Sequence, residues 1–320
     1  MQCAYYQSRE MKESIGKTIN SRKYDIIHIQ LTRMAPFITQ TKIRSINIPV
    51  ILDFIDTLSM NMEKRLHREI FLLKPFIFYE WSKIKRYEHK LAGIFDRGII
   101  TSPIDRALLP CRDKVDVLPS GVDLDLFRFS PVARREPMTI ISTGNMNYFP
   151  NVDAILFFIR KIYPVIKKSL PQVKLKIVGY SPPSIIKKLE SQKEAVEIIG
   201  SVGNMSDHLG RAAVAVCPML SGSGIKIKVL EALATGTPTV AMSLATQAIE
   251  VNPGKDILLA DDPNDFAQAV IDLLQNPKLR ESLGLNGRKL IENKYSWPII
   301  VEKLENIYKN AIENFNKSGD

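Results

Sequence analysis

A glycine-rich turn in the second half of the chain has the residue types and spacing best suited to binding an anion. It lies between an apolar run at 214–216 and a helical pattern over 225–235. Glycines let backbone approach a phosphate closely, and the free N–H groups at a helix N-terminus favour negative charge. The turn consists of Gly222, Ser223 and Gly224. We expect it to bind a phosphate, with Lys226 or Lys228 completing the charge neutralisation.

One face of the predicted helix would present two charges to that ligand. Lys228 and Glu231 follow Gly224 at positions i+4 and i+7, so the three share a face, whereas Lys226 points elsewhere. A lysine at the phosphates, with a carboxylate one turn deeper, suits a nucleoside diphosphate whose ribose hydroxyls donate to Glu231. The alternative is a surface ion pair worth about 0.2–0.5 kcal/mol. The apolar neighbours indicate a mostly buried helix, which favours the ligand interpretation.

Five segments, taken together, resemble the retaining glycosyltransferases of family 4, whose fold is GT-B. They are DIIHIQLTRMAPF at 25–37, LPSGVDLDLF at 118–127, STGNMNYFPNVDA at 142–154, KVLEALATGTPTVA at 228–241 and NPGKDILLADDPNDFAQAV at 252–270. The forms GNMNYFPNVDA and GSGIKIKVLEA are similar to a branch associated with exopolysaccharide and other surface-glycan synthesis. The resemblance implies two Rossmann-like, doubly wound α/β domains and transfer of a sugar from a nucleoside-diphosphate donor. The nucleoside-diphosphate sugar would be a substrate rather than a resident cofactor, and we expect the reaction to require no metal.

The donor site implied by the resemblance extends beyond the glycine turn. Gly144 and Asn145 follow the predicted strand at 138–142, so they should line the crevice at the carboxyl ends of the strands and face the turn. By the resemblance, Val202 stands at the rim of the site that contacts the nucleobase; the alternative is ordinary loop packing. Many family members carry a glutamate that contacts the donor sugar, but this chain has Ser223 in its place. The donor sugar therefore cannot be named by analogy.

The first domain has two candidate catalytic carboxylates, Asp53 and Asp56. They flank Ile55, which stands where many family members place a histidine, and the similar branch also uses aspartates in this segment. We expect them to contact the acceptor or handle its proton; the alternative for Asp56 is to cap the following helix. His28, within the first convincing strand, is expected to pack between strand and helix, with a catalytic role as the alternative.

The pattern predicts a first domain over 1–128, completed by a final helix at 299–315, and a donor domain over 129–298. Residues 1–20 read as polar and helical, and no strand with a Gly-rich turn precedes Tyr24. At about 30 residues per strand and helix unit, roughly two to three units of a GT-B first domain are absent, so we expect it to be incomplete. We therefore expect donor binding to be preserved better than transfer. The alternatives to a sugar transferase are a GT-B nucleotide-sugar epimerase and a donor-binding protein without catalytic activity that supports a partner transferase.

Composition bounds the remaining possibilities. The 320 residues exceed a usual single core, and the three widely spaced cysteines, at positions 3, 111 and 217, argue against a disulfide framework or a structural zinc. No apolar run reaches the length of a spanning helix, and the amino terminus lacks a signal-peptide core. We expect a cytoplasmic location, with peripheral attachment at the inner face of the plasma membrane as an option.

The net charge of +10 is concentrated in the first part of the chain, because residues 1–137 hold 23 basic and 16 acidic residues, a balance of +7. Within it, residues 64–90 combine basic residues with the segment IFLLKPFIFYEW. Such a stretch is typical either of a helix on an anionic bilayer or of core packing by Phe71, Leu72, Phe76 and Trp81 beneath a basic face, the simpler interpretation. The basic residues are diffuse and accompany no nucleic-acid motif, so we expect no nucleic-acid partner.

Overall fold

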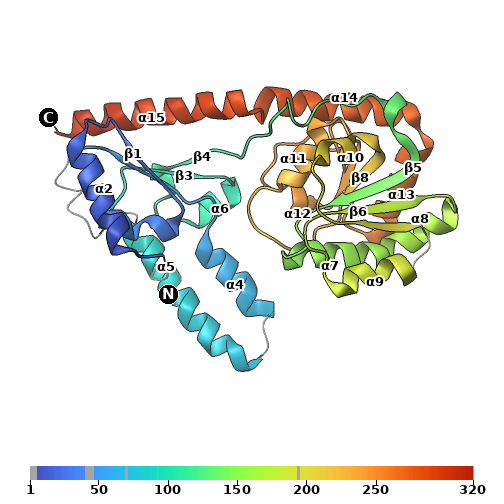
Figure 1. Ribbon diagram of the computed structural model, residues 1–320, viewed down its shortest axis with the longest axis horizontal. Coiled ribbons are helices and arrows are strands. Elements are labelled where there is room, and N and C mark those ends of the chain that lie inside the picture. Colours follow the sequence, from blue (N-terminus) through green and yellow to red (C-terminus); the bar gives the residue numbers. More distant parts are fainter. Residues whose placement is uncertain (1–5, 40–46, 69–70, 92, 193–194, 320) are drawn as a thin grey trace. The chain divides into compact units, whose positions relative to one another are not determined.

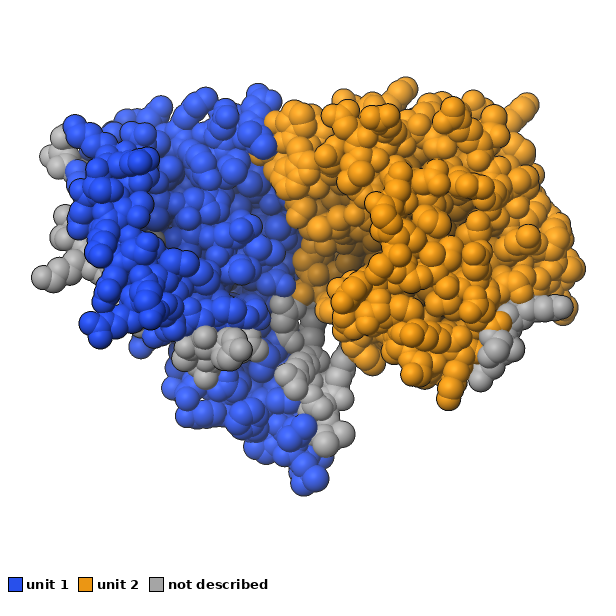
Figure 2. Space-filling model, in the orientation of Figure 1, with its two compact units in different colours: residues 1–119, 301–320 blue, residues 120–300 orange. Residues whose placement is uncertain are grey.

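The computed structural model describes residues 6–39, 47–68, 71–91, 93–192 and 195–319. The chain divides into two compact units, coloured separately in Figure 2. The first unit combines residues 1–119 with 301–320, and the second is residues 120–300. Cys3 and the first residues of the expected N-terminal helix lie outside the described part.

The first unit is built on a parallel sheet of four strands in the order β1-β2-β3-β4. The strands are β1 (Ile27–Gln30), β2 (Val50–Asp53), β3 (Arg97–Ile100) and β4 (Val115–Val117). The central strands are apolar and buried, as expected of a sheet with both faces covered. The register pairs Gln30 with Asp53, so the carboxyl ends of β1 and β2 are level.

Helices accompany this sheet along the chain (Figure 1). They are α2 (Arg9–Ser21), α3 (Pro36–Thr39), α4 (Leu58–Arg68), α5 (Lys74–Leu91), α6 (Pro103–Leu108) and, from the end of the chain, α15 (Trp297–Gly319). The far half of α15 packs Ala311 against Ile51 and Ile99 of the sheet, with Leu304, Ile307 and Tyr308 beside them. The return of a final helix to the first unit follows the expectation, although this helix is longer than 299–315.

Residues 64–90 do not form one helix. Instead, α4 and α5 form an antiparallel pair that extends away from the sheet (Figure 1), with a short 3₁₀ turn, Phe71–Leu73, before α5. Pro75 is the second residue of α5, a position where its missing N–H costs no helical hydrogen bond. The expectation that Phe71, Leu72 and Phe76 pack in the core is wrong, since their exposed fractions are 85%, 84% and 68%. Of the four side chains named in that expectation, only Trp81 packs against the buried side chains between the two helices.

The second unit contains a parallel sheet of six strands in the order β10-β9-β8-β5-β6-β7. Its strands are β5 (Glu136–Thr143), β6 (Lys174–Val178), β7 (Val196–Ile199), β8 (Ala212–Cys217), β9 (Thr239–Ala241) and β10 (Leu258–Leu259). The order reverses between β5 and β8, so the crevice at their carboxyl ends is the place where open α/β sheets bind ligands. This doubly wound architecture is the one expected from the alternating sequence pattern.

Helices cover both faces of the second sheet and form two apolar clusters with it. They are α7 (Phe149–Phe157), continued by a π-helical turn (Phe158–Ile162) and α8 (Tyr163–Ser169), then α9 (Ser184–Gln192), α10 (Met205–Arg211), α11 (Ile227–Ala234), α12 (Ser243–Thr246), α13 (Pro263–Gln275) and α14 (Pro277–Lys294). Among the residues that the structure describes, none of the helices combines the length and apolar composition that crossing a bilayer requires.

Along the sequence, the first stretch of the first unit ends at Pro119 and the second unit begins at Ser120, earlier than the expected boundary after residue 128. Val122 and Phe127 are buried in a core cluster of the second unit, and Val122 forms a bridge with Ser296. A Cβ on Gly121 would lie 2.7 Å from the indole of Trp297, so only glycine fits there. Residues 120–128 therefore connect the two ends of the second unit through the bridge between Val122 and Ser296.

Candidate donor-binding site

The glycine turn follows the carboxyl end of β8 and precedes α11. Gly222 has φ +124° and Gly224 has φ +66°, both in the left-handed region that glycine adopts most readily. The turn thus needs both glycines to fold as it does. It lies outside the carboxyl end of a central strand, where the topology places a ligand crevice.

Lys226 stabilises the turn from within. Its side chain is buried, and its ammonium group donates hydrogen bonds to the carbonyls of Ser223 at 2.6 Å and Gly224 at 3.2 Å. The role expected for a lysine at a phosphate therefore fits Lys228 better, because the Lys226 charge already serves the carbonyl groups of the turn.

Lys228 and Glu231 are half-buried on α11 and are not engaged with each other. Among the described residues, neither side chain makes a hydrogen bond or an ion pair within 4.0 Å, which is inconsistent with the surface ion pair considered above. Burial lowers the pKa of Lys228, and the charges of Cys217 and Glu231 oppose this. Burial also raises the pKa of Glu231, against the charge of Lys228. Two half-buried charges without partners are costly unless a ligand engages them.

A second loop adjoins the glycine turn, at the end of β5. The hydroxyl of Tyr148 lies 3.5 Å from the position of a Cβ on Gly222, so the two loops are neighbours. Gly144 packs its carbonyl 1.8 Å from the position of a Cβ on Gly179, which only a glycine at 179 permits. Asn145 shapes this loop, since its side-chain oxygen accepts from the Asn147 N–H at 2.9 Å.

Two further side chains complete the description of this crevice. Val202 lies between β7 and α10 and packs, partly buried, against the core cluster that includes α11. Ser221 is 5% exposed, and its hydroxyl has no hydrogen-bond partner among the described residues. Sequence reasoning missed Ser221; the repeated small residues of the Ser-Gly-Ser-Gly run were the available signal. A buried hydroxyl without a partner is uncommon, so Ser221 is a further candidate for contact with a ligand at the glycine turn.

The carboxylates of the first unit lie at and just beyond the end of β2. Asp53 accepts the Ile55 N–H at 2.9 Å, and its other oxygen lies 3.8 Å from Nε2 of His28. Ile55 has φ +61°, an uncommon conformation for a β-branched residue, and its carbonyl accepts the Thr101 hydroxyl at 2.7 Å. A strained residue thus stands between the two candidate aspartates.

Asp56 is not the cap of the following helix. Helix α4 begins at Leu58, which puts Thr57 rather than Asp56 at the cap position. Glu88, a residue that sequence reasoning missed, accepts the Ser59 N–H at 3.3 Å instead. Burial raises the pKa of Glu88, to which the charge of Asp56 also contributes.

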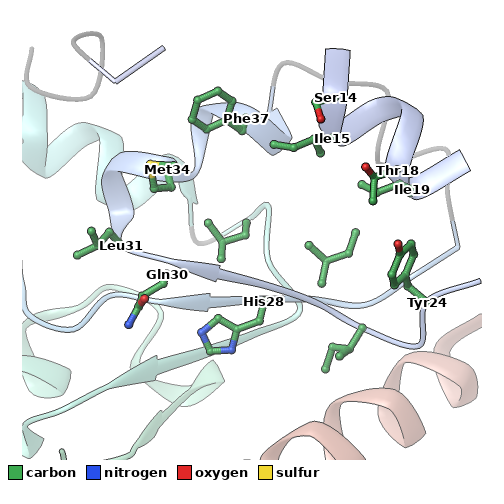
Figure 3. A pocket seen from close by; sticks show the side chains of 13 residues that line it. Ser14, Ile15, Thr18, Ile19, Tyr24, His28, Gln30, Leu31, Met34 and Phe37 are labelled. Carbon is green, nitrogen blue, oxygen red and sulfur yellow. The ribbon is translucent and has the colours of Figure 1, made fainter. Parts of the chain in front are cut away.

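His28 packs between strand and helix, as expected. Its Nδ1 lies 2.7 Å from the Tyr308 hydroxyl of α15, and the two rings meet edge to face. His28 also lines an open pocket of about 660 Å³ that runs along residues 24–31, which include β1, and is bordered by α2 and α3 (Figure 3). The pocket wall is mostly aliphatic and aromatic, and it reaches Gln30, the register partner of Asp53.

The described residues contain no group of three or more His, Cys, Asp and Glu side chains arranged to hold a metal ion. The positive groups beside the crevice of the second unit are instead Lys228, Lys226 and the backbone amides of the turn. The donor-site residues belong to the second unit, and Asp53 and Asp56 belong to the first.

Comparison with known proteins matches residues 137–276 to the family described as Glycosyl transferases group 1. A protein of the cps region of Klebsiella pneumoniae is 24% identical over 232 residues, 67% of this chain and 59% of the relative. A GDP-mannose-dependent phosphatidylinositol monomannoside mannosyltransferase of Corynebacterium glutamicum is 28% identical over 214 residues, 59% of this chain and 55% of the relative. The chain thus spans less than two thirds of the length of these curated relatives.

Solved structures extend the likeness to nearly the whole chain. Sucrose-phosphate synthase of Thermosynechococcus elongatus has a TM-score of 0.73 at 19% identity, covering 97% of this chain and 81% of that one. Anabaena HepE, in complex with UDP and glucose, has a TM-score of 0.68 at 14% identity, covering 93% of this chain and 80% of that one. The chain therefore has the GT-B fold, and its residues 137–276, less than half of its length, match the group 1 glycosyl transferase family.

Proposed function

We propose that this protein transfers a sugar from a nucleoside-diphosphate donor to a lipid-linked or glycan acceptor, with retention, in the synthesis of a surface polysaccharide. The observation that carries the proposal is the pair Lys228 and Glu231, half-buried and unpaired on one face of α11 behind the glycine turn. A diphosphate bound at the turn would engage the lysine, and the ribose hydroxyls would donate to the glutamate.

The comparisons support the proposal without identifying the substrates. One relative is named for GDP-mannose, and HepE was crystallised with UDP, so the base of the donor differs between similar proteins. The Klebsiella relative lies in a cps region. The mostly apolar pocket along β1 would suit the lipid portion of an acceptor, because burying aliphatic surface is favourable and requires few polar contacts.

In the proposed reaction, the bond between the sugar C1 and the diphosphate oxygen breaks as a bond forms between C1 and an acceptor oxygen on the same face. The acceptor proton passes to the departing diphosphate. Lys228 and the turn amides would stabilise the charge that develops on this leaving group. Asp53 and Asp56 would orient the acceptor hydroxyl. These residues supply positioning and charge, so the reaction as proposed needs no metal.

Glu231→Ala tests the donor site. The variant should weaken the binding of UDP, GDP or ADP by about tenfold or more, because a hydrogen bond to a charged group is worth about 1.5–3 kcal/mol. Inorganic pyrophosphate, which has no ribose, should bind the variant and the parent alike. Isothermal titration calorimetry measures both, with Glu281→Ala on the exposed face of α14 as the matched control.

Equal affinity of parent and Glu231→Ala for every nucleoside diphosphate would remove Glu231 from the site. A turnover assay with donor sugar and lipid acceptor then separates the alternatives. Conversion of the nucleotide sugar without acceptor would indicate an epimerase, and binding without any turnover would indicate a non-catalytic donor-binding protein.

A further inference from the structure

The end of the helical pair of the first unit is covered with large apolar side chains that the fold leaves exposed. We call this surface the hairpin tip and define it by Phe71, Leu72, Leu73, Phe76, Phe78 and Tyr79. Phe71 and Leu72 are 85% and 84% exposed, Phe76 is 68% exposed and Phe78 is 53% exposed. Single exposed apolar residues are ordinary, but six within nine positions form a contiguous patch that calls for a partner.

The tip residues are not a displaced part of the core. Ile77, Trp81 and Ile84 recur at helical spacing on the face of α5 that packs against Met62 of α4. Ile77 and Ile84 are fully buried there, so the contact between α4 and α5 is complete without the tip. Phe76 and Tyr79 belong to the other side of α5, which no described element covers.

Positive charge follows the tip along α5. The Lys83 ammonium lies 4.1 Å above the centre of the Tyr79 ring, and that of Lys85 lies 5.0 Å from the centre of the Trp81 ring. Residues 71–90 hold five basic and two acidic residues, and one of the two acids, Glu88, is buried. The accessible surface behind the tip is therefore basic.

The order of these groups along the helix matches the layers of a bilayer surface. Phe76 and Tyr79 precede Lys83 and Arg86 by seven residues each, a rise of about 10 Å along an α-helix. Amphipathic anchors bury their apolar groups about 5–10 Å into the boundary between headgroups and acyl chains, with lysine and arginine at the headgroups. With the tip inserted, the basic side chains would stand at the level of lipid phosphates.

We propose that the hairpin tip docks the first unit on an anionic lipid bilayer. Charge complementarity favours this occupant over a second copy of the chain. A symmetric dimer through the tip would bring together two basic surfaces that each contain Lys83, Lys85 and Arg86, and bringing like charges close is unfavourable. An anionic bilayer provides opposite charge for the basic residues and apolar depth for the phenylalanines.

The test is co-sedimentation of the full chain with vesicles, without nucleotide or acceptor, so that it does not depend on the proposed transfer reaction. The parent should bind phosphatidylcholine vesicles that contain phosphatidylglycerol, and should bind pure phosphatidylcholine far less. The double variant F71S/L72S should lose at least about tenfold in partition at any salt, because two apolar side chains no longer leave water. K83E/K85E should lose binding mainly at low salt, where charge attraction is least screened.

Leu285→Ser is the control, since Leu285 is 42% exposed on α14 of the second unit and should leave vesicle binding unchanged. A Phe71→Trp variant reports the same event directly, by a blue shift of the added tryptophan's emission when anionic vesicles are added. Absence of binding to anionic vesicles at low salt, or unchanged binding by F71S/L72S, would overturn the proposal. It would also be overturned if light scattering showed that F71S/L72S converts a dimer of the parent into monomers, which would identify the tip as a protein interface.

Discussion

Lys226 and Lys228 are two residues apart, yet the fold gives their ammonium groups different surroundings. The first donates to two carbonyls of the glycine turn, and the second lies half-buried on α11 without a hydrogen bond among the described residues. The sequence marked both as candidates because either could reach a phosphate. Helical spacing placed Lys228 on the face of Glu231, but Lys226, expected on another face of the same helix, is the extended residue directly before α11. The spacing could not show that Lys226 folds back onto its own turn, because that contact depends on the positive φ of Gly222 and Gly224.

The shifted pKa values of this pair predict how donor binding depends on pH. The pKa of Lys228 is lowered from 10.5, so as the pH rises the ammonium loses its proton, and diphosphate affinity falls, before pH 10.5 is reached. The pKa of Glu231 is raised from 4.5, so as the pH falls the carboxylate gains a proton, and affinity for the ribose falls, before pH 4.5 is reached. Calorimetry of UDP across pH should therefore give a bell whose limbs lie inside these two values.

Two controls isolate the limbs of that profile. Lys228→Arg should extend the alkaline limb upward, because a guanidinium stays charged over the whole range. Pyrophosphate, which lacks the ribose, should show no acid limb from Glu231. A profile that is identical in the parent and Lys228→Arg would show that another group controls the alkaline side.

Helix α15 packs on the sheet of the first unit, and Tyr308 makes a polar contact there with His28 of β1. Tyr308→Phe removes the hydroxyl that lies 2.7 Å from His28 Nδ1 and should destabilise the first unit by about 1 kcal/mol. Hydrogen exchange of the β1 and α15 amides should quicken in this variant. Tyr180→Phe, at a tyrosine that is 60% exposed in the second unit, is the matched control. Unchanged exchange in Tyr308→Phe would mean that the apolar contacts of Ala311 and its neighbours suffice.

The elements of the second unit were easier to predict than those of the first. Its strands are apolar runs, and the sequence located β5 and β8 closely because a buried parallel strand has no polar face to obscure it. In the first unit, residues 64–90 belong to two helices, α4 and α5, with a 3₁₀ turn at Phe71–Leu73 before α5. The apolar character of IFLLKPFIFYEW was interpreted as core because burial is the usual state of such residues. Pro75 was the local signal for the break.

At the scale of the whole molecule, the second unit has what it needs to fold by itself. A fragment of residues 120–300 should unfold cooperatively on heating, followed by circular dichroism, and should bind nucleoside diphosphate with an affinity close to that of the full chain. The reason is that both apolar clusters and the donor residues lie within it.

The boundary expected from the sequence provides the comparison for this fragment. A fragment of residues 129–298 lacks Val122 and Phe127, so it loses the β-bridge between Val122 and Ser296 and should be less stable than 120–300. Equal melting temperatures of the two fragments would show that this bridge is dispensable. Aggregation of both would show that the second unit depends on the first.

The first unit is made of two stretches of chain, and its last stretch comes after the whole of the second unit. During synthesis on the ribosome, residues 1–119 emerge first but cannot be completed, because Ala311 and its neighbours on α15 have yet to be translated. Ile51 and Ile99 remain uncovered on the face that α15 later covers while the second unit is synthesised and folds. The first unit is thus completed after the second, and the nascent protein passes through a state in which a folded second unit is joined to an unfinished sheet, a state that molecular chaperones would recognise.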